Sequence, residues 1–509
     1  MAAGNYYSKD KVRRSLKHFV VGKAGGALVG LLTLLLTVRV LSVSDYGLYV
    51  ALVGYLEIFN VISSFGLNVL SERLVPELRA SGHEAKLRSL IAQLVRIRAL
   101  LLTLSSSLVV LVIWLMGDQL DIGNVLPAVL VYQLVVSFET LARFCESIFD
   151  SLLQQGNAQA SLLSRTALRL LFLAGVWVTT GHIDLVQWLW LEVLAYGCGL
   201  LITLFLTHRT LRRLPRPEEG VAGLRPALSS SIQIYLSQVL GVLVGIDAVK
   251  ILVLRTSSAE VAAVFGFCAS LAWMVQRYLP SYLLVGMVRP LVVAAVAAGK
   301  EGSDRLRAIV SIMLKINLLL VGCLVVLMAG AGDVAVNLLS GGKFNSAGAL
   351  VLLLLIYVWS NSVRALVGYL AMAHGHGASM LWGQVAGALA LLIVAVAALG
   401  AAGVYAYGAA LIAMNATWIA LVATRLNLGG QWPALRLQGF VRSVAALTFF
   451  SLVASIGGHW ISPLGNYWVI ASASVFLLAY LTGSAVFRAF DPDERRMINN
   501  MLPKRIFVF

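Results

Sequence analysis

The sequence predicts an all-α polytopic membrane protein with about fourteen transmembrane helices. The 509 residues are 60% hydrophobic and only 12% charged, with a mean hydropathy of +0.88. Soluble domains carry roughly 25% charged residues, so this composition cannot supply a water-soluble surface. Apolar runs of about 20 residues, the length that crosses about 30 Å of hydrocarbon, recur from end to end. They leave no room for a separate soluble domain.

Six apolar runs precede a basic segment at residues 207–228. The predicted spans are residues 19–41, 47–70, 94–116, 124–149, 162–180 and 183–206. The basic segment contains four arginines and two prolines within nine residues, from Arg209 to Pro217. Prolines interrupt a helix, and clustered arginines do not enter lipid. We therefore expect a cytoplasmic linker between two halves of the chain.

Eight further runs follow the linker. They are residues 229–254, 259–288, 306–330, 347–373, 378–400, 403–424, 439–460 and 466–487, and the longest external connection is predicted at 331–346. The predicted organisation is an N-terminal six-helix lobe at 1–206, the linker at 207–228, and a C-terminal six-helix lobe at 229–424. Two extra helices and a cytoplasmic tail occupy 425–509.

The distribution of Lys and Arg predicts the orientation of the spans. Basic residues collect in the cytoplasmic connections of membrane proteins. Alternate connections, including residues 165–169, contain 30 of the 39 basic residues, and the opposite connections contain only Arg255 and Lys343. Both termini are therefore expected in the cytoplasm. The same clustering explains the net charge of +16 without nucleic-acid binding.

An internal duplication is expected from the number of spans. Six spans before the linker start the second half on the same side of the membrane as the first, so the two lobes would be parallel repeats. Gly22, Gly26 and Gly30 in the first span have a counterpart in Gly241 and Gly245 of the seventh. Small residues at four-residue spacing allow helices to approach closely.

The chain has no pattern typical of a metal centre or an ATPase. Its four cysteines lie in apolar segments without metal-ligand spacing, and no phosphate-binding P-loop sequence occurs. His374 and His376 are close in sequence but have no third ligand nearby, which favours a helix-breaking turn. We expect no cofactor, no metal and no enzymatic activity.

Charges inside the spans are the informative positions. A charge at the bilayer centre costs roughly 2.5 to 3.5 kcal/mol, so it normally faces a bundle interior or an aqueous cavity. Glu139, Arg143 and Glu146 share one face of the fourth span and can neutralise one another. Other candidates for ion coupling or charge pairing are Glu57, Glu192, Asp247, Lys250 and Lys315.

Two arginines of the second half are candidates for binding an anion. Arg277 and Arg364 lie well inside spans and have no acidic residue within four positions. Pro280 would kink the helix after Arg277, and aromatic residues precede Arg364. Cations beside aromatic rings suit a phosphate next to a sugar. The alternative, that these arginines pair with Glu57 or Glu192 across the bundle, stays open.

The N-terminal quarter contains a recognisable series of short motifs. They are Arg39-Val40-Leu41-Ser42, Asp45-Tyr46-Gly47-Leu48-Tyr49, Phe65-Gly66-Leu67 and Arg73-Leu74-Val75-Pro76. This stretch resembles bacterial polysaccharide flippases of the multidrug/oligosaccharidyl-lipid/polysaccharide exporter superfamily, and the span number and central linker extend the resemblance to full length. The second half departs from the family pattern, with Glu260 and Phe265 where a Gly-x-Tyr phrase is usual.

The resemblance implies a transporter with two pseudo-symmetric six-helix lobes around a central cavity, plus two C-terminal helices. It would move undecaprenyl-pyrophosphate-linked oligosaccharide units from the cytoplasmic to the periplasmic leaflet by alternating access, for O-antigen, exopolysaccharide or capsule synthesis. Basic residues lining the cavity would hold the pyrophosphate. The candidates are Arg277, Arg364, Lys23 and Arg39.

The expected location is the bacterial inner membrane. The expected partners are the lipid-linked oligosaccharide, membrane lipids and other polysaccharide-assembly proteins. Three alternatives stay open: a multidrug efflux antiporter of the same superfamily, a membrane-embedded polysaccharide polymerase or ligase, and a scaffold that transports nothing.

Overall fold

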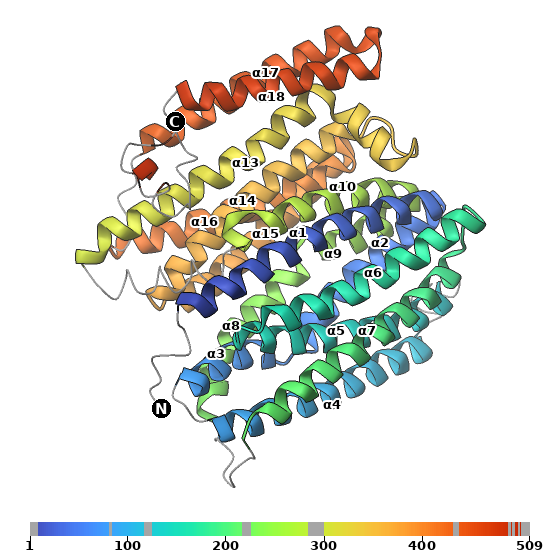
Figure 1. Ribbon diagram of the computed structural model, residues 1–509. Coiled ribbons are helices and arrows are strands. Elements are labelled where there is room, and N and C mark those ends of the chain that lie inside the picture. The colour runs from blue at the N-terminus through green and yellow to red at the C-terminus, as the bar shows by residue number, and fades with distance from the viewer. Residues whose placement is uncertain are drawn as a thin grey trace. The chain divides into compact units, whose positions relative to one another are not determined.

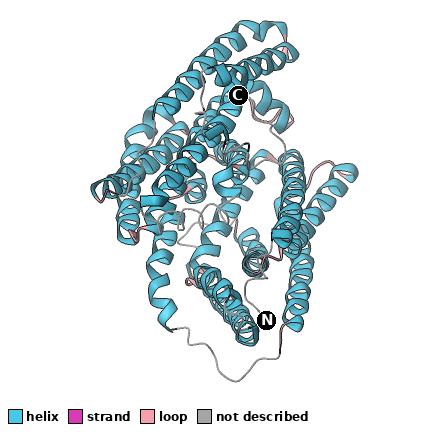
Figure 2. Ribbon diagram, turned by 60° about the vertical axis from the view of Figure 1, so that its left-hand side comes forward, coloured by secondary structure: helices cyan, strands magenta, loops and turns pink. Residues whose placement is uncertain are grey.

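The computed structural model describes residues 9–80, 84–116, 125–215, 225–283, 300–430, 437–486, 490, 494–496 and 499. These residues form seventeen α-helices and one short 3-10 helix, and none of them lies in a strand (Figure 2). The all-α fold class predicted from the sequence is confirmed. The chain divides into two compact units, Met1–Ala263 and Val264–Phe509, which we describe separately.

Unit 1 contains nine helices and the start of a tenth among its described residues. They are α1 (Lys9–Val40), α2 (Val43–Ile62), α3 (Leu67–Ala80), α4 (Glu84–Met116), α5 (Leu126–Ser151), α6 (Gln155–Thr179), α7 (Leu185–Arg213), α8 (Arg225–Leu243), α9 (Ile246–Thr256) and the beginning of α10 (Ala259–Tyr278) (Figure 1). Side-chain caps fix two of the starts: Ser42 accepts from the Asp45 amide at 3.0 Å, and Asp184 accepts from the Val186 amide at 3.1 Å.

Unit 2 contains the rest of α10 and the helices that follow. They are α11 (Pro280–Leu283), α13 (Lys300–Ser340), α14 (Gly348–Ala373), α15 (Gly377–Ala402), α16 (Tyr405–Leu428), α17 (Leu437–Ile461), the 3-10 helix η2 (Ser462–Leu464) and α18 (Asn466–Val486).

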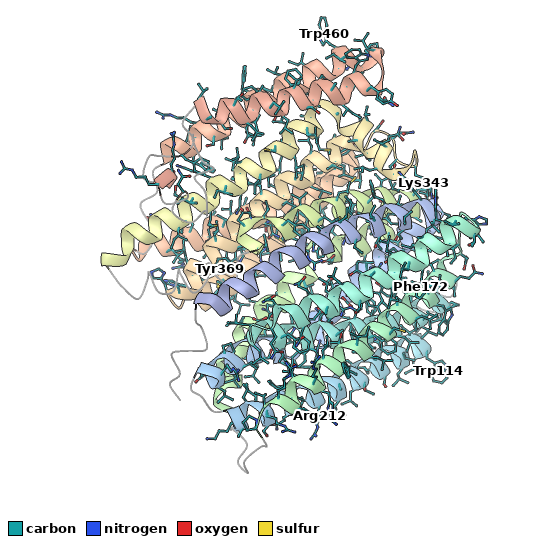
Figure 3. All side chains as sticks on the ribbon, viewed as in Figure 1. Trp114, Phe172, Arg212, Lys343, Tyr369 and Trp460 are labelled. Atoms are coloured by element: carbon teal, nitrogen blue, oxygen red, sulfur yellow. The ribbon has the colours of Figure 1, made fainter. Side chains whose placement is uncertain are left out.

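Thirteen helices in the described part of the chain are long and apolar enough to cross a membrane. The remaining predicted span is the first one, where the described apolar stretch of α1 is Gly25–Val40. The outer faces are apolar, as lipid contact requires. Trp114 of α4 and Trp460 of α17 project away from their helices (Figure 3) and are 78% and 79% exposed, which is typical of aromatic residues at a membrane interface.

Three predicted spans are not continuous helices. The span at 47–70 is interrupted between α2 and α3, where Phe65 and Gly66 adopt positive φ angles of 46° and 80°. The span at 229–254 is interrupted at Gly245, which is the N-cap of α9. The span at 259–288 is interrupted before Pro280, whose ring cannot continue the hydrogen bonding of α10.

The predicted external connection at 331–346 is wrong in its extent. Helix α13 continues to Ser340, with a kink at Ala331 where φ is −139°. The sequence here, Gly330-Ala331-Gly332, looks like a loop because glycine weakens a helix. Close packing explains why the helix continues: a Cβ added at Gly348 would lie 2.5 Å from the Asp333 amide nitrogen.

Glycines bring α2 of unit 1 into backbone contact with α9 and with the start of α10. A Cβ added at Gly54 would lie 2.5 Å from the carbonyl oxygen of Asp247, and one added at Gly47 would lie 2.0 Å from that of Ala259. The close approach expected along the first span is present at Gly22, where a Cβ would lie 2.5 Å from Cγ of Gln159 on α6. It is absent at Gly30, where a Cβ would have no described atom within 4 Å. Small residues thus set the helix spacing of unit 1.

The two C-terminal helices pack on α13 in unit 2. Helices α17 and α18 run side by side along it (Figure 1). Val326, Ala454 and Tyr480 form the buried centre of this contact. A Cβ added at Gly458 would lie 2.1 Å from the carbonyl oxygen of Gly330, so α13 and α17 meet at their backbones.

The boundary between the two compact units lies between residues 263 and 264, so α8 and α9 belong to unit 1. The predicted domain boundaries, with lobes on either side of the linker at 207–228, stay a prediction. Most of that linker, residues 216–224, lies outside the described residues.

Candidate functional site

A chain of alternating charges occupies the interior of unit 1. Arg143 of α5 contacts Glu57 of α2 at 2.8 Å and Glu139, one turn earlier on α5, at 2.6 Å. The other carboxylate oxygen of Glu139 lies 2.7 Å from Arg165 of α6, which also lies 2.8 Å from Glu146. The expected neutralisation within α5 is therefore present, and it extends to two neighbouring helices.

A second buried ion pair joins α6 to α7. Arg169 lies 2.5 Å from Glu192, and the hydroxyl of Tyr49 donates to Glu192 at 2.8 Å while accepting from Arg169 at 2.7 Å. The guanidinium of Arg169 also lies 5.4 Å from the ring centroid of Tyr196. Glu192 is only 1% exposed. A charge this deeply buried is tolerated because it is paired and hydrogen-bonded.

Arg165 and Arg169, which the count of basic residues assigned to a cytoplasmic connection, do not lie in a loop. Both residues lie inside α6, and the side chain of Arg165 is only 2% exposed. The four-residue spacing of the two arginines could have indicated their place in a helix, because it puts both on one helix face. The acids that neutralise them come from α5 and α7 and are distant in sequence, so the pairing itself was hidden.

Arg364 of α14 has a different environment, in the interior of unit 2. One terminal nitrogen donates to the amide oxygen of Asn415 on α16 at 3.0 Å, and the other donates to the amide oxygen of Gln384 on α15. The indole of Trp418 covers the guanidinium, with 4.9 Å between its carbon and the ring centroid. Among the described residues, no carboxylate lies within ion-pair distance of Arg364.

The groups around Arg364 are themselves held in place. The Asn415 amide donates to the hydroxyl of Ser360 at 3.0 Å, and the indole nitrogen of Trp418 donates to the carbonyl of Met380 at 3.2 Å. Asn415 is fully buried and Trp418 is 3% exposed, whereas Arg364 is half-buried. The result is a fixed cation whose described ligands are neutral.

Arg277, near the end of α10, also has no acidic partner among the described residues. Its guanidinium lies 5.3 Å from the ring centroid of Trp273. No described hydrogen bond or ring contact links Arg277 to Arg364, so the shared cavity expected for them stays a prediction. The helix does end shortly after Arg277, before Pro280, as the sequence indicated.

The remaining candidates are distributed over three places. Lys23 falls on α1, with its side chain outside the described part of the chain, and Arg39 is half-buried in the last turn of that helix. Lys250 pairs with Asp247 of the same helix at 2.7 Å, as their spacing suggested.

Lys315 of α13 pairs with a residue that the sequence did not indicate. Its ammonium lies 2.7 Å from the carboxylate of Glu494, which also accepts from the Ser311 hydroxyl at 2.5 Å. Phe490 packs against Ile312 beside this pair. The C-terminal segment thus neutralises Lys315, and both charged side chains are less than 10% exposed.

Within the described residues, no group of three His, Cys, Asp or Glu side chains is placed to hold a metal ion. His374 lies at the C-cap of α14 with its Nδ1 2.9 Å from the Leu370 carbonyl oxygen, and Gly375, with φ of 76°, makes the turn to α15. The His-Gly-His-Gly sequence is therefore located at a helix-breaking turn.

Three residues of the Arg364 environment were missed by sequence reasoning: Gln384, Asn415 and Trp418. Each is a polar or aromatic residue in a predominantly apolar span. Polar residues in such spans usually face protein rather than lipid. That signal marks them as buried but does not reveal which charge they surround.

Comparisons with known structures support a transporter fold. "Lipid II flippase MurJ, inward closed conformation" is similar with a TM-score of 0.61 and 12% identity, over 94% of this chain and 99% of that one. An inward-facing multidrug resistance MATE family transporter of the MOP superfamily gives 0.58 and 13%, over 80% and 95% of the two chains. An outward-facing conformation of such a transporter gives 0.56 and 12%, over 84% and 97%. At these identities the likeness is one of fold.

The sequence itself identifies a family. No curated protein matches the chain. Residues 16–286, more than half of the chain, match the family model described as "Polysaccharide biosynthesis protein". The resemblance inferred from the N-terminal motifs is thereby confirmed, and the protein belongs to the polysaccharide biosynthesis protein family.

Proposed function

We propose that the protein is a flippase that moves undecaprenyl-pyrophosphate-linked oligosaccharide units from the cytoplasmic to the periplasmic leaflet of the bacterial inner membrane. Family membership and the transporter fold support this role. The product would serve a cell-surface polysaccharide such as O-antigen, exopolysaccharide or capsule. Arg364 would hold the pyrophosphate, with Arg277, Lys23 and Arg39 as further basic contacts.

The observation that supports this proposal best is the environment of Arg364. Glu57 and Glu192, the acids with which it could have paired, are instead bound to Arg143 and Arg169. Arg364 is left with amide oxygens and an indole ring. A guanidinium in low dielectric attracts an anion strongly when no carboxylate neutralises it, and its forked donors match phosphate oxygens.

Export of the polysaccharide in variants of Arg364 tests the proposal. We expect Arg364→Ala to lower export by roughly tenfold or more, because a hydrogen bond to a charged group contributes about 1.5 to 3 kcal/mol. Arg364→Lys should retain part of the activity, since it keeps the charge but loses the forked geometry. Arg442→Ala, at an exposed arginine of the same unit, is the matched control.

Membrane levels of each variant must be compared with wild type. Wild-type export by Arg364→Ala at normal membrane levels would contradict the role of Arg364. Normal export in a deletion strain, with loss of resistance to cationic drugs instead, would favour the multidrug antiporter.

A further inference from the structure

A buried amide beside Arg364 has an unused hydrogen-bond donor. The oxygen of Gln384 accepts from Arg364, so the NH₂ group of the same amide points elsewhere. Gln384 is 1% exposed, and its Nε2 has no hydrogen-bond partner among the described residues. Buried polar groups are nearly always paired, so an orphan of this kind calls for a ligand.

The chemistry around Gln384 determines which ligand fits. The adjacent guanidinium bears a positive charge, and its described ligands are neutral. A cation would be repelled from this place, and an apolar group would leave the amide donor unpaired. An anionic oxygen satisfies the amide and the guanidinium together.

We infer that Arg364 and Gln384 form one anion-binding site, in which Gln384 donates from its Nε2 to a phosphate oxygen held by Arg364. This inference rests on the proposed function and adds Gln384 as a ligand-contacting residue. Asn415 and Trp418 act as positioning residues: Asn415 fixes one edge of the guanidinium and Trp418 fixes its plane. The ligand class is a phosphate or pyrophosphate group.

Gln384→Glu separates this role from a purely structural one. The substitution keeps the size of the side chain and an oxygen acceptor for Arg364, and it adds an ion pair. If the cluster only joins α14 to α15, the variant should unfold at the same temperature or a higher one and export normally. If the cluster binds an anion, the added carboxylate removes the donor and neutralises the charge, so binding and export should be lost.

Direct binding provides the first measurement. The purified full-length protein in detergent is titrated with inorganic pyrophosphate and, separately, with farnesyl pyrophosphate, and the thermal unfolding midpoint is followed. We expect both to stabilise wild type, and Gln384→Glu to bind at least roughly tenfold more weakly. Arg442→Ala should bind as wild type does. Binding by Gln384→Glu that equals wild type would overturn the inference.

A second variant keeps the test decisive if Gln384→Glu does not accumulate. Gln384→Met removes the amide and leaves Arg364 charged, so pyrophosphate should still bind but more weakly than to wild type. Unchanged affinity in Gln384→Met would show that Nε2 donates to no ligand. Absence of pyrophosphate binding by wild type would equally overturn the site.

Vesicles distinguish the sources of the phosphate. If the site binds a pyrophosphate-linked substrate, phosphatidylglycerol vesicles should reduce the binding of farnesyl pyrophosphate only weakly. Equal competition would contradict that assignment and identify a membrane-lipid headgroup as the ligand. A different result would contradict the proposed function alone: pyrophosphate binds to the purified protein, but a deletion strain exports polysaccharide normally.

Discussion

Four of the arginines inside the described helices fall into two classes by what surrounds them. Arg143, Arg165 and Arg169 of unit 1 each contact carboxylates. Arg364 of unit 2 contacts amides and an indole. The first class can be explained by charge neutralisation alone, whereas the second leaves a positive charge available for a ligand. Sequence spacing predicted the Arg143–Glu139 pair, since helix periodicity fixes it, but partners from other helices depend on packing.

Arg165 should be needed for folding rather than for binding. Arg165→Ala leaves Glu139 and Glu146 without this partner, and breaking a buried ion pair costs about 3 to 5 kcal/mol. We expect a lower unfolding midpoint in detergent. The double variant Arg165→Ala/Glu146→Gln should recover part of the loss, because one unpaired charge is removed. Equal stability of wild type and Arg165→Ala would contradict the structural role.

At the scale of helices, the sequence predicted the spans but not every interruption within them. Hydrophobic runs predicted where chain segments cross the membrane, because apolar length is a one-dimensional property. They did not predict the break between α2 and α3, where Phe65 and Gly66 turn the chain. The carbonyls freed at this break are satisfied from other helices: Arg98 of α4 donates to Ser63 and Asn60, and Tyr235 of α8 donates to Ile62 at 2.8 Å.

Arg98 should stabilise the end of α2. It is fully buried, and Arg98→Ala removes donors from two carbonyl oxygens; each unsatisfied buried group costs about 1 to 3 kcal/mol. We expect faster hydrogen–deuterium exchange at residues 60–66. Arg96→Ala, at an exposed position two residues earlier, is the control and should exchange like wild type. Equal hydrogen–deuterium exchange in Arg98→Ala and Arg96→Ala would show that Arg98 does not stabilise the interruption between α2 and α3.

We expect Glu494 to attach the C-terminal segment to α13. Glu494→Ala leaves Lys315 buried and unpaired, whereas Glu494→Gln keeps an acceptor for the Ser311 hydroxyl. We therefore expect protease cleavage after residue 486 to be faster in the alanine variant than in wild type, with the glutamine variant between them. Arg496→Ala, an exposed position, should change nothing. Equal cleavage of Glu494→Ala and wild type would contradict this attachment.

At the scale of the whole molecule, composition and charge distribution were sufficient to predict the class of protein. A low charged fraction and recurrent apolar runs dictate many membrane helices, and thirteen are observed among the described residues. The assignment of helices to compact units was not predictable in the same way. Helices α8 and α9 cluster with unit 1 through contacts such as Gly54 with Asp247, and single glycines in apolar sequence do not reveal their partners.

Reporter fusions test the predicted orientation in the membrane. Fusions after Gly181 and Gly342 should report an external location, and fusions after Arg213 and Gly430 an internal one. Gly342 is chosen because α13 extends to Ser340, beyond the predicted end of its span. Reversal of two or more fusions would contradict the topology inferred from the basic residues.

The most direct test of the central claim is the leaflet location of the lipid-linked repeat unit. A strain lacking the protein is complemented with wild type or Arg364→Ala, and the repeat unit is labelled in spheroplasts and in inverted membrane vesicles. The flippase account predicts periplasmic labelling with wild type, and accumulation on the cytoplasmic leaflet in the deletion strain and with Arg364→Ala. Normal periplasmic labelling in the deletion strain would contradict it.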